Sequence, residues 1–341
     1  MRHQELLDKL QSLQDLPDED LAFLLGSSDP SMQEELHARA REVSMERFGN
    51  EVFLRGLVEW SNVCRNDCLY CGIRRSNAAV SRYSLTQEQI LACTESLYQK
   101  GLRTVVLQGG ENPAGALDLV PVVAQIRRRW PHLAITISLG ELPFAIYAAL
   151  REAGANRYLL RHESACPAHY ARLHPEGMSL ANRLACLAEL RRLGFQVGMG
   201  MMVGSPYQTV ANLVADIRLI QEYGPEMIGI GPFVPQQDTP LGAFPAGDSQ
   251  LTLRLYSILR LMLPDALIPA TTALATVLPG GCIKGILAGA NVIMPNFTPA
   301  TVSGHYALYN HKSHQELENI VKDLHSIGFA ASASRGDYCK H

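Results

Sequence analysis

The stretch VFLRGLVEWSNVCRNDCLYC, residues 52–71, joins a run of apolar and aromatic residues to three closely spaced cysteines. Its first nine residues, 52–60, have the composition of a buried strand. The Asn-Asp pair at 66–67 is a turn signal, and no apolar stripe continues the cysteine spacing on either side. The stretch therefore predicts a strand that ends in a cysteine-bearing loop.

The rest of the chain repeats this order of strand and helix. Helical stretches, several of which end in Gly, separate seven further short apolar runs. The predicted strands after 52–60 are 104–108, 134–138, 156–160, 196–203, 226–231, 267–270 and 291–294. Strands joined by helices form a parallel sheet with right-handed crossovers, and eight such units close a barrel. We therefore predict an α/β fold, a (βα)8 TIM barrel; the alternative, an open doubly wound sheet, usually has fewer strands.

The barrel is predicted to occupy residues 49–312. Residues 1–48 carry the acidic or Pro starts and Gly stops of short helices and predict an N-terminal helical extension. Residues 313–341 predict a C-terminal helix and tail. In such barrels the chemistry lies on loops at the C-terminal ends of the strands, so functional residues should directly follow strands.

Composition limits the class of function. The 341 residues are 47% hydrophobic and 18% charged, with a formal net charge of −3, as in a globular protein. Because this balance offers no basic footprint, we expect no nucleic-acid partner. The charged N-terminus lacks the apolar region of a signal peptide, and no apolar run approaches the roughly 20 residues that cross a bilayer. We expect no membrane partner and a cytoplasmic protein whose thiols stay reduced.

Cys64, Cys68 and Cys71 have the spacing C-x3-C-x2-C, which admits three interpretations. The spacing fits one face of a core helix, but polar residues lie between the cysteines. A zinc site usually has four Cys or His ligands in two close pairs, and the chain has no second pair. Three thiolates suit a four-iron cluster with one iron left open to a further ligand. We favour the cluster; a non-enzymatic zinc-binding scaffold protein is the alternative of another class.

The cysteine motif, with the aromatic Tyr70 before its third cysteine, resembles the signature of the radical S-adenosylmethionine (SAM) superfamily. The resemblance implies a barrel of the radical SAM type with a 4Fe-4S cluster on the three cysteines. It also implies that SAM chelates the open iron and is cleaved reductively to methionine and a 5′-deoxyadenosyl radical. The chain is therefore expected to be an enzyme.

The resemblance further implies that SAM is bound by residues that follow the strands. The implied residues are Tyr70, Gly109, Gly110, Glu111, Glu163, Arg183 and Met202. Glu111, in a GGE motif, would accept from the SAM amino group, and Glu163, also expected to be catalytic, would hold the ribose. Arg183 would pair with the SAM carboxylate, and the Gly/Met-rich run around Met202 would face the adenine. Without the resemblance, these residues fit a tight turn, a solvated loop, a surface arginine and core filler.

Five stretches resemble one branch of the superfamily, the HydE family of FeFe-hydrogenase maturases: FLRGLVEWSNVCRNDCLYCGIRRSN, RYLLRHES, GIGPFVPQQDTPL, IPATTA and GANVIMPNFTP. The resemblance spans about residues 48–310. It implies a role in H-cluster assembly, with an iron–cysteine carbonyl/cyanide complex as the substrate on the way to the bridging dithiomethylamine ligand. The implied substrate residues in an internal cavity are Arg161, Met227, Thr271, Thr272, Met294 and Tyr306.

The same resemblance implies transient contacts with other hydrogenase maturases and with a reductant such as ferredoxin or flavodoxin, and we expect a monomer. Methylornithine synthase and biotin synthase share the general plan and are the alternatives. Some family members carry further cysteines near the C-terminus for a second cluster, but SGHYALYNHKSHQELENIV here has none. We expect His305, His311 and His314 to be surface histidines, Cys339 to be incidental, and the chain to hold one cluster.

Overall fold

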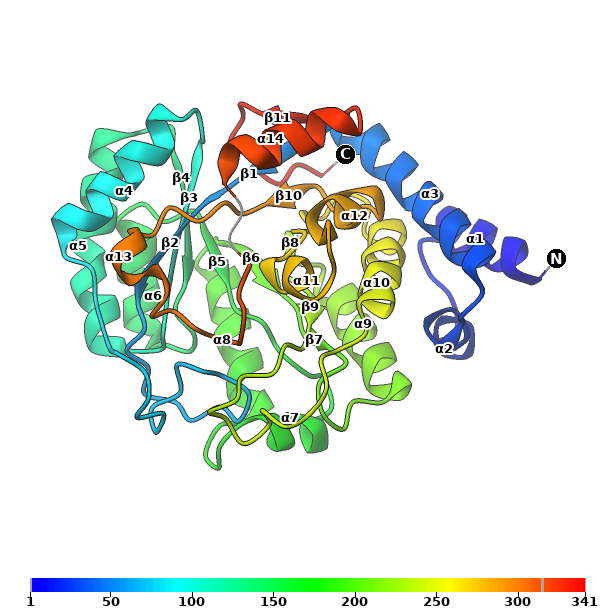
Figure 1. Ribbon diagram of the computed structural model, residues 1–341, viewed down its shortest axis with the longest axis horizontal. Coiled ribbons are helices and arrows are strands. Elements are labelled where there is room, and N and C mark those ends of the chain that lie inside the picture. The colour runs from blue at the N-terminus through cyan, green and yellow to red at the C-terminus, as the bar shows by residue number, and fades with distance from the viewer. Residues whose placement is uncertain (1, 314–315, 341) are drawn as a thin grey trace.

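The computed structural model describes residues 2–313 and 316–340 and has a barrel of parallel strands at its centre (Figure 1). Six strands form one parallel sheet in the order in which they follow along the chain. They are β2 (Gly56–Ser61), β3 (Thr104–Gly109), β4 (Ala134–Ser138), β5 (Arg157–Leu159), β6 (Gln196–Met199) and β8 (Met227–Ile228). The short strands β7 (Met202–Val203) and β9 (Gly231–Pro232) pair with each other just beyond β6 and β8.

Isolated bridges close this sheet into a ring of eight. Segment 267–270 bridges to β8 on one side and to β10 (Val292–Ile293) on the other. β10 pairs in turn with β1 (Glu51–Leu54), which leads directly into β2. The predicted strand 52–60 is therefore divided at Arg55, where the chain passes from one set of pairing partners to the next. The predicted (βα)8 barrel is confirmed.

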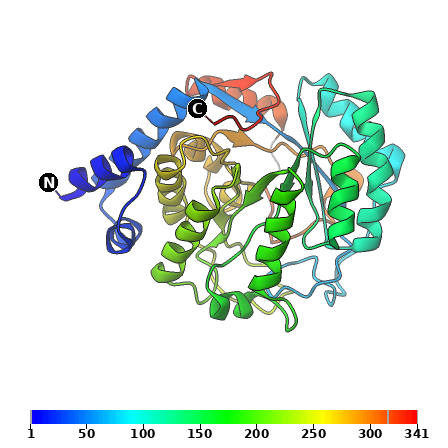
Figure 2. The same ribbon diagram turned by 180° about the vertical axis from the view of Figure 1, so that it is seen from behind.

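Helices surround the barrel, and their apolar faces form one continuous core with the strands (Figures 1 and 2). The longer ones are α4 (Gln87–Gln99), α5 (Pro113–Arg129), α6 (Phe144–Glu152), α8 (Leu180–Arg192), α9 (Val210–Tyr223) and α10 (Ser249–Met262). The shorter ones are α7 (Pro167–Leu173), α11 (Thr272–Val277), α12 (Gly281–Leu287), α13 (Ala300–Ser303) and α14 (Leu317–Ser326). The predicted C-terminal helix corresponds to α14, and residues 314–315 before it lie outside the described residues.

Three N-terminal helices project from one side of the barrel, at the right of Figure 1. They are α1 (Arg2–Leu13), α2 (Asp18–Gly26) and α3 (Pro30–Phe48). α3 begins where Asp29 accepts a hydrogen bond from Ser31 N and Pro30 occupies the first turn, a favourable helix start. His37 Nδ1 lies 2.8 Å from Ser257 Oγ of α10, which ties α3 to the barrel. The division of the chain at 48/49 and 312/313 stays a prediction.

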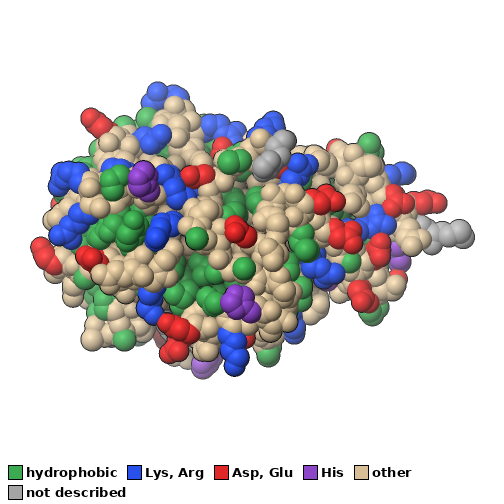
Figure 3. All heavy atoms as spheres, turned by 90° about the horizontal axis from the view of Figure 1, so that it is seen from above, with side chains coloured by type: hydrophobic (Ala, Val, Ile, Leu, Met, Phe, Trp, Pro, Cys, Tyr) green, Lys and Arg blue, Asp and Glu red, His purple; other side chains and the backbone are tan. Residues whose placement is uncertain are grey.

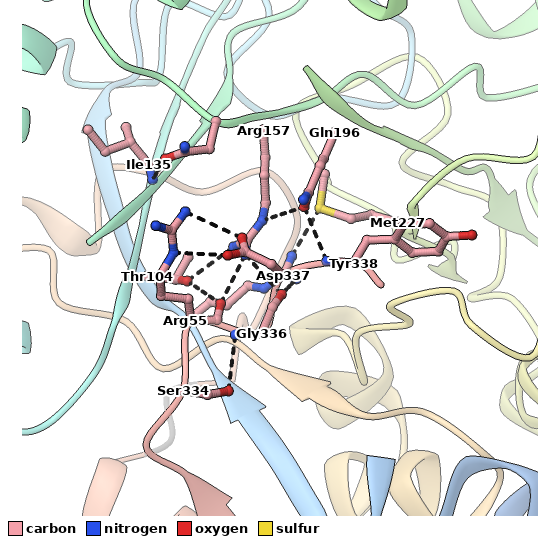
Figure 4. Close-up of polar contacts among 12 residues, drawn as sticks. Arg55, Thr104, Ile135, Arg157, Gln196, Met227, Ser334, Gly336, Asp337 and Tyr338 are labelled. Carbon is pink, nitrogen blue, oxygen red and sulfur yellow. Dashed lines mark hydrogen bonds and ion pairs between the residues drawn. The ribbon is translucent and has the colours of Figure 1, made fainter. Parts of the chain in front are cut away.

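The C-terminal segment closes the end of the barrel opposite to the cysteine loop. β11 (Ala330–Ser332), which the sequence did not predict, pairs in parallel with β1. Beyond it, the fully buried Arg157 donates to two tail carbonyls and, at 2.6 Å, to Asp337 Oδ1 (Figure 4). Buried Arg55 also reaches the tail, at Gly336 O (Figure 4). The tail thus supplies hydrogen-bond acceptors to two buried guanidinium groups.

The surface mixes both signs of charge. Figure 3 shows basic and acidic side chains interspersed over the barrel, with hydrophobic side chains between them. None of the described helices is both long and apolar enough to cross a membrane.

Candidate functional site

The three motif cysteines lie in the irregular segment that follows β2. Residues 62–77 contain no helix, so the three cysteines do not form a helical stripe in a core. Cys64, Cys68 and Cys71 are half-buried, and all three line one cavity of about 330 Å³ at the C-terminal ends of the strands. This segment is the light-blue loop at the lower edge of Figure 1. The rule that functional residues follow strands therefore holds for the motif.

Arg82 organises the cysteine segment from outside the cavity. Its Nη1 donates to the carbonyls of Asn62 and Ile73, each at 2.7 Å, and its Nη2 donates to Arg74 O at 2.5 Å. Gly72, directly after Cys71, is held by the C-terminal part of the chain, because its N–H donates to Leu308 O at 2.9 Å. Backbone groups on both sides of the cysteines are therefore fixed, although the segment has no regular secondary structure.

The thiols fit an iron–sulfur cluster better than a single metal ion. Among the described residues, no group of three or more His, Cys, Asp or Glu side chains converges on one point, as one ion would require. In a four-iron cluster each thiolate binds a different iron, so the sulfurs need only face a common space. Burial raises the pKa of all three thiols, to about 12 for Cys71. Iron must therefore displace their protons when the thiolates bind.

The GGE residues continue the same cavity at the end of β3. A Cβ on Gly110 would lie 2.5 Å from Val63 O, so only glycine lets these two backbone segments approach so closely. Glu111 is buried, and its carboxylate accepts from Arg65 Nε at 2.8 Å and from Glu141 N at 2.6 Å. Each carboxylate oxygen accepts more than one hydrogen bond, so Glu111 retains acceptor capacity for an ammonium group.

Arg161, Glu163 and Arg183 meet on the part of the cavity wall that lies next to Glu111 and Glu141. Arg161 Nη2 donates to Glu163 Oε2 at 2.9 Å, and Arg183 Nη1 donates to the carbonyl of Arg161. Buried Glu141 accepts from Arg183 Nε at 2.6 Å. Burial opposes the charge of Arg183, but Tyr170 and Glu141 raise the pKa of its guanidinium overall. A fixed cation and a carboxylate therefore lie side by side in the cavity wall.

Glu141 is a residue that sequence reasoning missed. It follows β4 in the same way that Glu111 follows β3, so the strand-end rule that found the other candidates applies to it. Its partner Asn182 lies on α8 together with Arg183. Glu141 thus joins the wall around Glu111 to the wall around Arg183, since it contacts both.

Tyr70 and Met202 border the mouth of the cavity. Tyr70 OH lies 3.4 Å from His174 Nε2, and burial lowers the pKa of His174 to about 3, so the imidazole is neutral. Met202 lies in a small apolar cluster with Leu173 and Phe233. Met202 therefore both packs in an apolar cluster, as the core interpretation predicts, and lines the cavity.

Five of the six implied substrate residues line the same cavity. Thr271, Thr272, Met294 and Tyr306 all line it together with Arg161. Thr271 also caps α11, because its hydroxyl oxygen accepts a hydrogen bond from Leu274 N. Arg161 Nε is buried and has no hydrogen-bond partner among the described residues, so it is available to an anionic ligand.

Met227 does not belong to this group, and its expected place in the cavity is wrong. The residue begins β8, so it lies at the far end of the barrel from the cysteines. Its sulfur accepts from Arg55 Nη1 at 3.0 Å (Figure 4). Its side chain packs in one apolar cluster with Leu267 and Val292. In a barrel strand only residues at the C-terminal end reach the mouth.

A buried ion pair in the cavity was also missed. Lys312 Nζ donates to Glu59 Oε1, and Asn296 Nδ2 donates to Glu59 Oε2 at 3.0 Å. Glu59 is 1% exposed. An acidic residue inside an otherwise apolar strand was the signal that could have found it.

The C-terminal histidines do not gather at a metal site within the described residues. His305 lies near the ring of Tyr83, at 6.3 Å between centroids, and its carbonyl accepts from Asn62. His311 is exposed, with a positive φ of 52°. His314 lies outside the described residues, and Cys339 is exposed.

Comparisons with known proteins agree with this geometry. Residues 58–220 match the model of the Radical SAM superfamily. The HydE subunit of the [FeFe] hydrogenase maturase from Thermotoga maritima is 44% identical over 310 residues, which cover 91% of this chain and 88% of the relative. The 3-methylornithine synthase of Methanosarcina barkeri is 31% identical over 94% of this chain and 92% of the relative.

Solved structures show the same fold. A methylornithine synthase (PylB) superposes with a TM-score of 0.85 at 29% identity and covers 96% of this chain and 97% of its own. The [FeFe]-hydrogenase maturase HydG superposes with a TM-score of 0.83 over 97% of this chain and 76% of its own, at 22% identity.

The barrel, the cysteine loop at its mouth and the cavity beneath are those of an enzyme that uses a 4Fe-4S cluster and SAM. The chain belongs to the radical SAM superfamily and, within it, to the HydE family. The zinc-binding scaffold is thereby excluded as its class.

Proposed function

We propose that this enzyme acts in the assembly of the FeFe-hydrogenase cluster, on an iron–cysteine carbonyl/cyanide complex that leads to the dithiomethylamine bridge. The observation that carries the proposal is the 44% identity to the HydE subunit across 91% of the chain. The cavity supports it, because Arg161 and the hydroxyls of Thr271 and Thr272 suit the carboxylate of an amino-acid ligand.

In this proposal Cys64, Cys68 and Cys71 hold the cluster, which supplies the electron for SAM cleavage. Glu111 would accept from the amino group of SAM and Arg183 would pair with its carboxylate, while Glu141 orients the Arg183 guanidinium through its hydrogen bond to Nε. Gly109 and Gly110 line the cavity beside the cysteines, and without a Cβ they let the end of β3 pack against Trp60 and Val63.

The remaining residues shape the rest of the ligand space. Glu163 accepts from the ribose hydroxyls, and Tyr70 and Met202 border the adenine. Met294 and Tyr306 line the deeper space for the substrate and exclude water from it. These residues would keep water from the space in which SAM and the substrate would react.

The proposal includes a cytoplasmic monomer that contacts other hydrogenase maturases and an electron donor such as ferredoxin or flavodoxin only transiently. Such a donor must approach the mouth, because the cysteine segment lies there. The proposal includes no nucleic-acid partner and no membrane partner.

The second candidate is a methylornithine synthase, since such a relative is 31% identical over 94% of the chain. Anaerobically reconstituted protein with dithionite and SAM should form 5′-deoxyadenosine, and the iron–cysteine complex should increase its formation. Lysine should have no such effect and yield no methylornithine. Methylornithine formation would instead establish the second candidate, and failure to restore hydrogenase activity in a strain without HydE would refute the first.

A further inference from the structure

The turn after β5 holds Glu163 in a backbone conformation that a glutamate rarely adopts. Its φ is 66°, in the left-handed region, where a side chain is strained. Such strain persists only when the surroundings fix the turn. The carboxylate of Glu163 nevertheless faces the cavity, where it pairs with Arg161.

A buried histidine and a buried aspartate fix this turn. His162 and Asp216 of α9 are both completely buried. His162 Nε2 lies 3.2 Å from Asp216 Oδ1, and Gly200 N donates to His162 Nδ1 at 3.3 Å. Since Nδ1 accepts, the proton is on Nε2 and is donated to the carboxylate.

Asp216 also holds the turn beyond Glu163. Its Oδ1 accepts from Ala165 N at 2.5 Å, and Glu163 N donates to Gly200 O at 3.0 Å. Both ends of the strained residue are thus tied, one to α9 and one to the strand end at Gly200. Asp216 Oδ2 is buried without a hydrogen-bond partner among the described residues, a costly arrangement for a purely structural residue.

The hydrogen bonds of His162 affect the cavity because His162 stands in the sequence between Arg161 and Glu163, which both line it. Arg161 and Glu163 turn their side chains to the cavity, and His162 turns its ring away from it into α9. The carbonyl of Arg161 also accepts from Arg183. One anchored turn therefore sets the relative positions of two cations and one carboxylate.

We propose that the Asp216–His162 pair is a positioning device that fixes Glu163 and Arg161 for SAM and substrate. The inference rests on the proposed assignment of Glu163 to bound SAM. Neither residue of the pair lines the cavity, so both act through the turn.

The test compares variants of the full-length, reconstituted enzyme. Asp216→Ala and His162→Leu should raise the KM for SAM about tenfold, with iron content and the cluster signal without SAM unchanged. His162→Gln, which keeps a donor and an acceptor, should recover most of the affinity. The change that SAM induces in the spectrum of the reduced cluster should weaken in the same order.

His37→Leu is the matched control, because it removes a histidine–serine hydrogen bond between α3 and α10 whose two residues do not line the cavity. It should leave the KM for SAM unchanged. Asp216→Ala and His162→Leu variants that lose only thermal stability, with a KM within twofold, would overturn the inference. If Asp216→Ala and His162→Leu both fail to fold, the test is made with Asp216→Asn. This variant should raise the KM for SAM at least threefold, and an unchanged KM would overturn the inference.

Glu163→Ala separates this inference from the assignment beneath it. If Glu163→Ala leaves SAM binding intact, the assignment of Glu163 is wrong and the inference is overturned together with it. If Glu163→Ala weakens SAM binding while the variants of the pair do not, the assignment stands and the positioning role alone is wrong.

Discussion

Replacing Gly110 with alanine is expected to lower the rate of SAM cleavage about 100-fold while the cluster still binds. A Cβ at this position would lie 2.5 Å from Val63 O and 2.8 Å from the Cβ of Cys64. A carbon–oxygen contact needs roughly 3.3 Å, so the backbone beside Cys64 must move by about 0.8 Å. Overpacking of this kind costs about 1–3 kcal/mol, and a displacement of about 1 Å at reacting groups can lower a rate about 100-fold.

The assay is the formation of 5′-deoxyadenosine under anaerobic conditions with dithionite, at matched iron content. Gly26→Ala is the control, because a Cβ at the end of α2 meets nothing within 4 Å. Its rate should equal that of the unchanged protein. If Gly110→Ala with a full cluster reacts within threefold of the unchanged protein, the close backbone contact does not position the cysteine loop, and the reasoning is refuted.

Three further changes test the site and the fold. Cys68→Ala is expected to abolish stable cluster binding, since two thiolates remain; unchanged iron after anaerobic reconstitution would contradict this. Asp337→Asn should lower the free energy of unfolding by about 1–3 kcal/mol, because buried Arg157 loses its charged acceptor; an unchanged urea midpoint would show that the pair adds nothing. Burial lowers the pKa of His37 to about 4 from the ordinary 6.5, so the unfolded chain takes up the proton first as the pH falls. His37 should therefore contribute about 2 kcal/mol to the loss of stability between pH 8 and pH 5, in addition to the contribution of buried His174. The pH slope should be smaller in His37→Leu, and an unaltered slope would show that His37 contributes nothing.

The order of elements was predictable because each strand and helix carries its own local pattern. β3 and β4 match the predicted runs 104–108 and 134–138 within one residue. Segment 267–270 was predicted as a strand but forms isolated bridges, and β11 was not predicted at all. Pairing depends on what lies alongside a segment, and β11 exists because the tail reaches β1 from about 280 residues away.

The candidate site was predictable wherever a residue type is unusual at the end of a strand. The cysteines, Glu111 and Glu163 were found in this way, and the structure brings them to one cavity. Met227 was misplaced because it stands at the start of its strand rather than at its end. Asp216 gave no signal, because a polar residue in an amphipathic helix looks like a surface residue until its partner across the fold is known.

The sequence by itself determined the alternation of strands and helices, the position of the cysteine loop and, through its motifs, the class of chemistry. These features are local, since periodicity, turn residues and ligand spacing act within a few residues. Only the tertiary structure decided which side chains face one another: Glu141 with Arg183, Glu59 with Lys312, and His162 with Asp216. These pairs join residues 42, 253 and 54 positions apart, and burial makes their charges and hydrogen bonds matter.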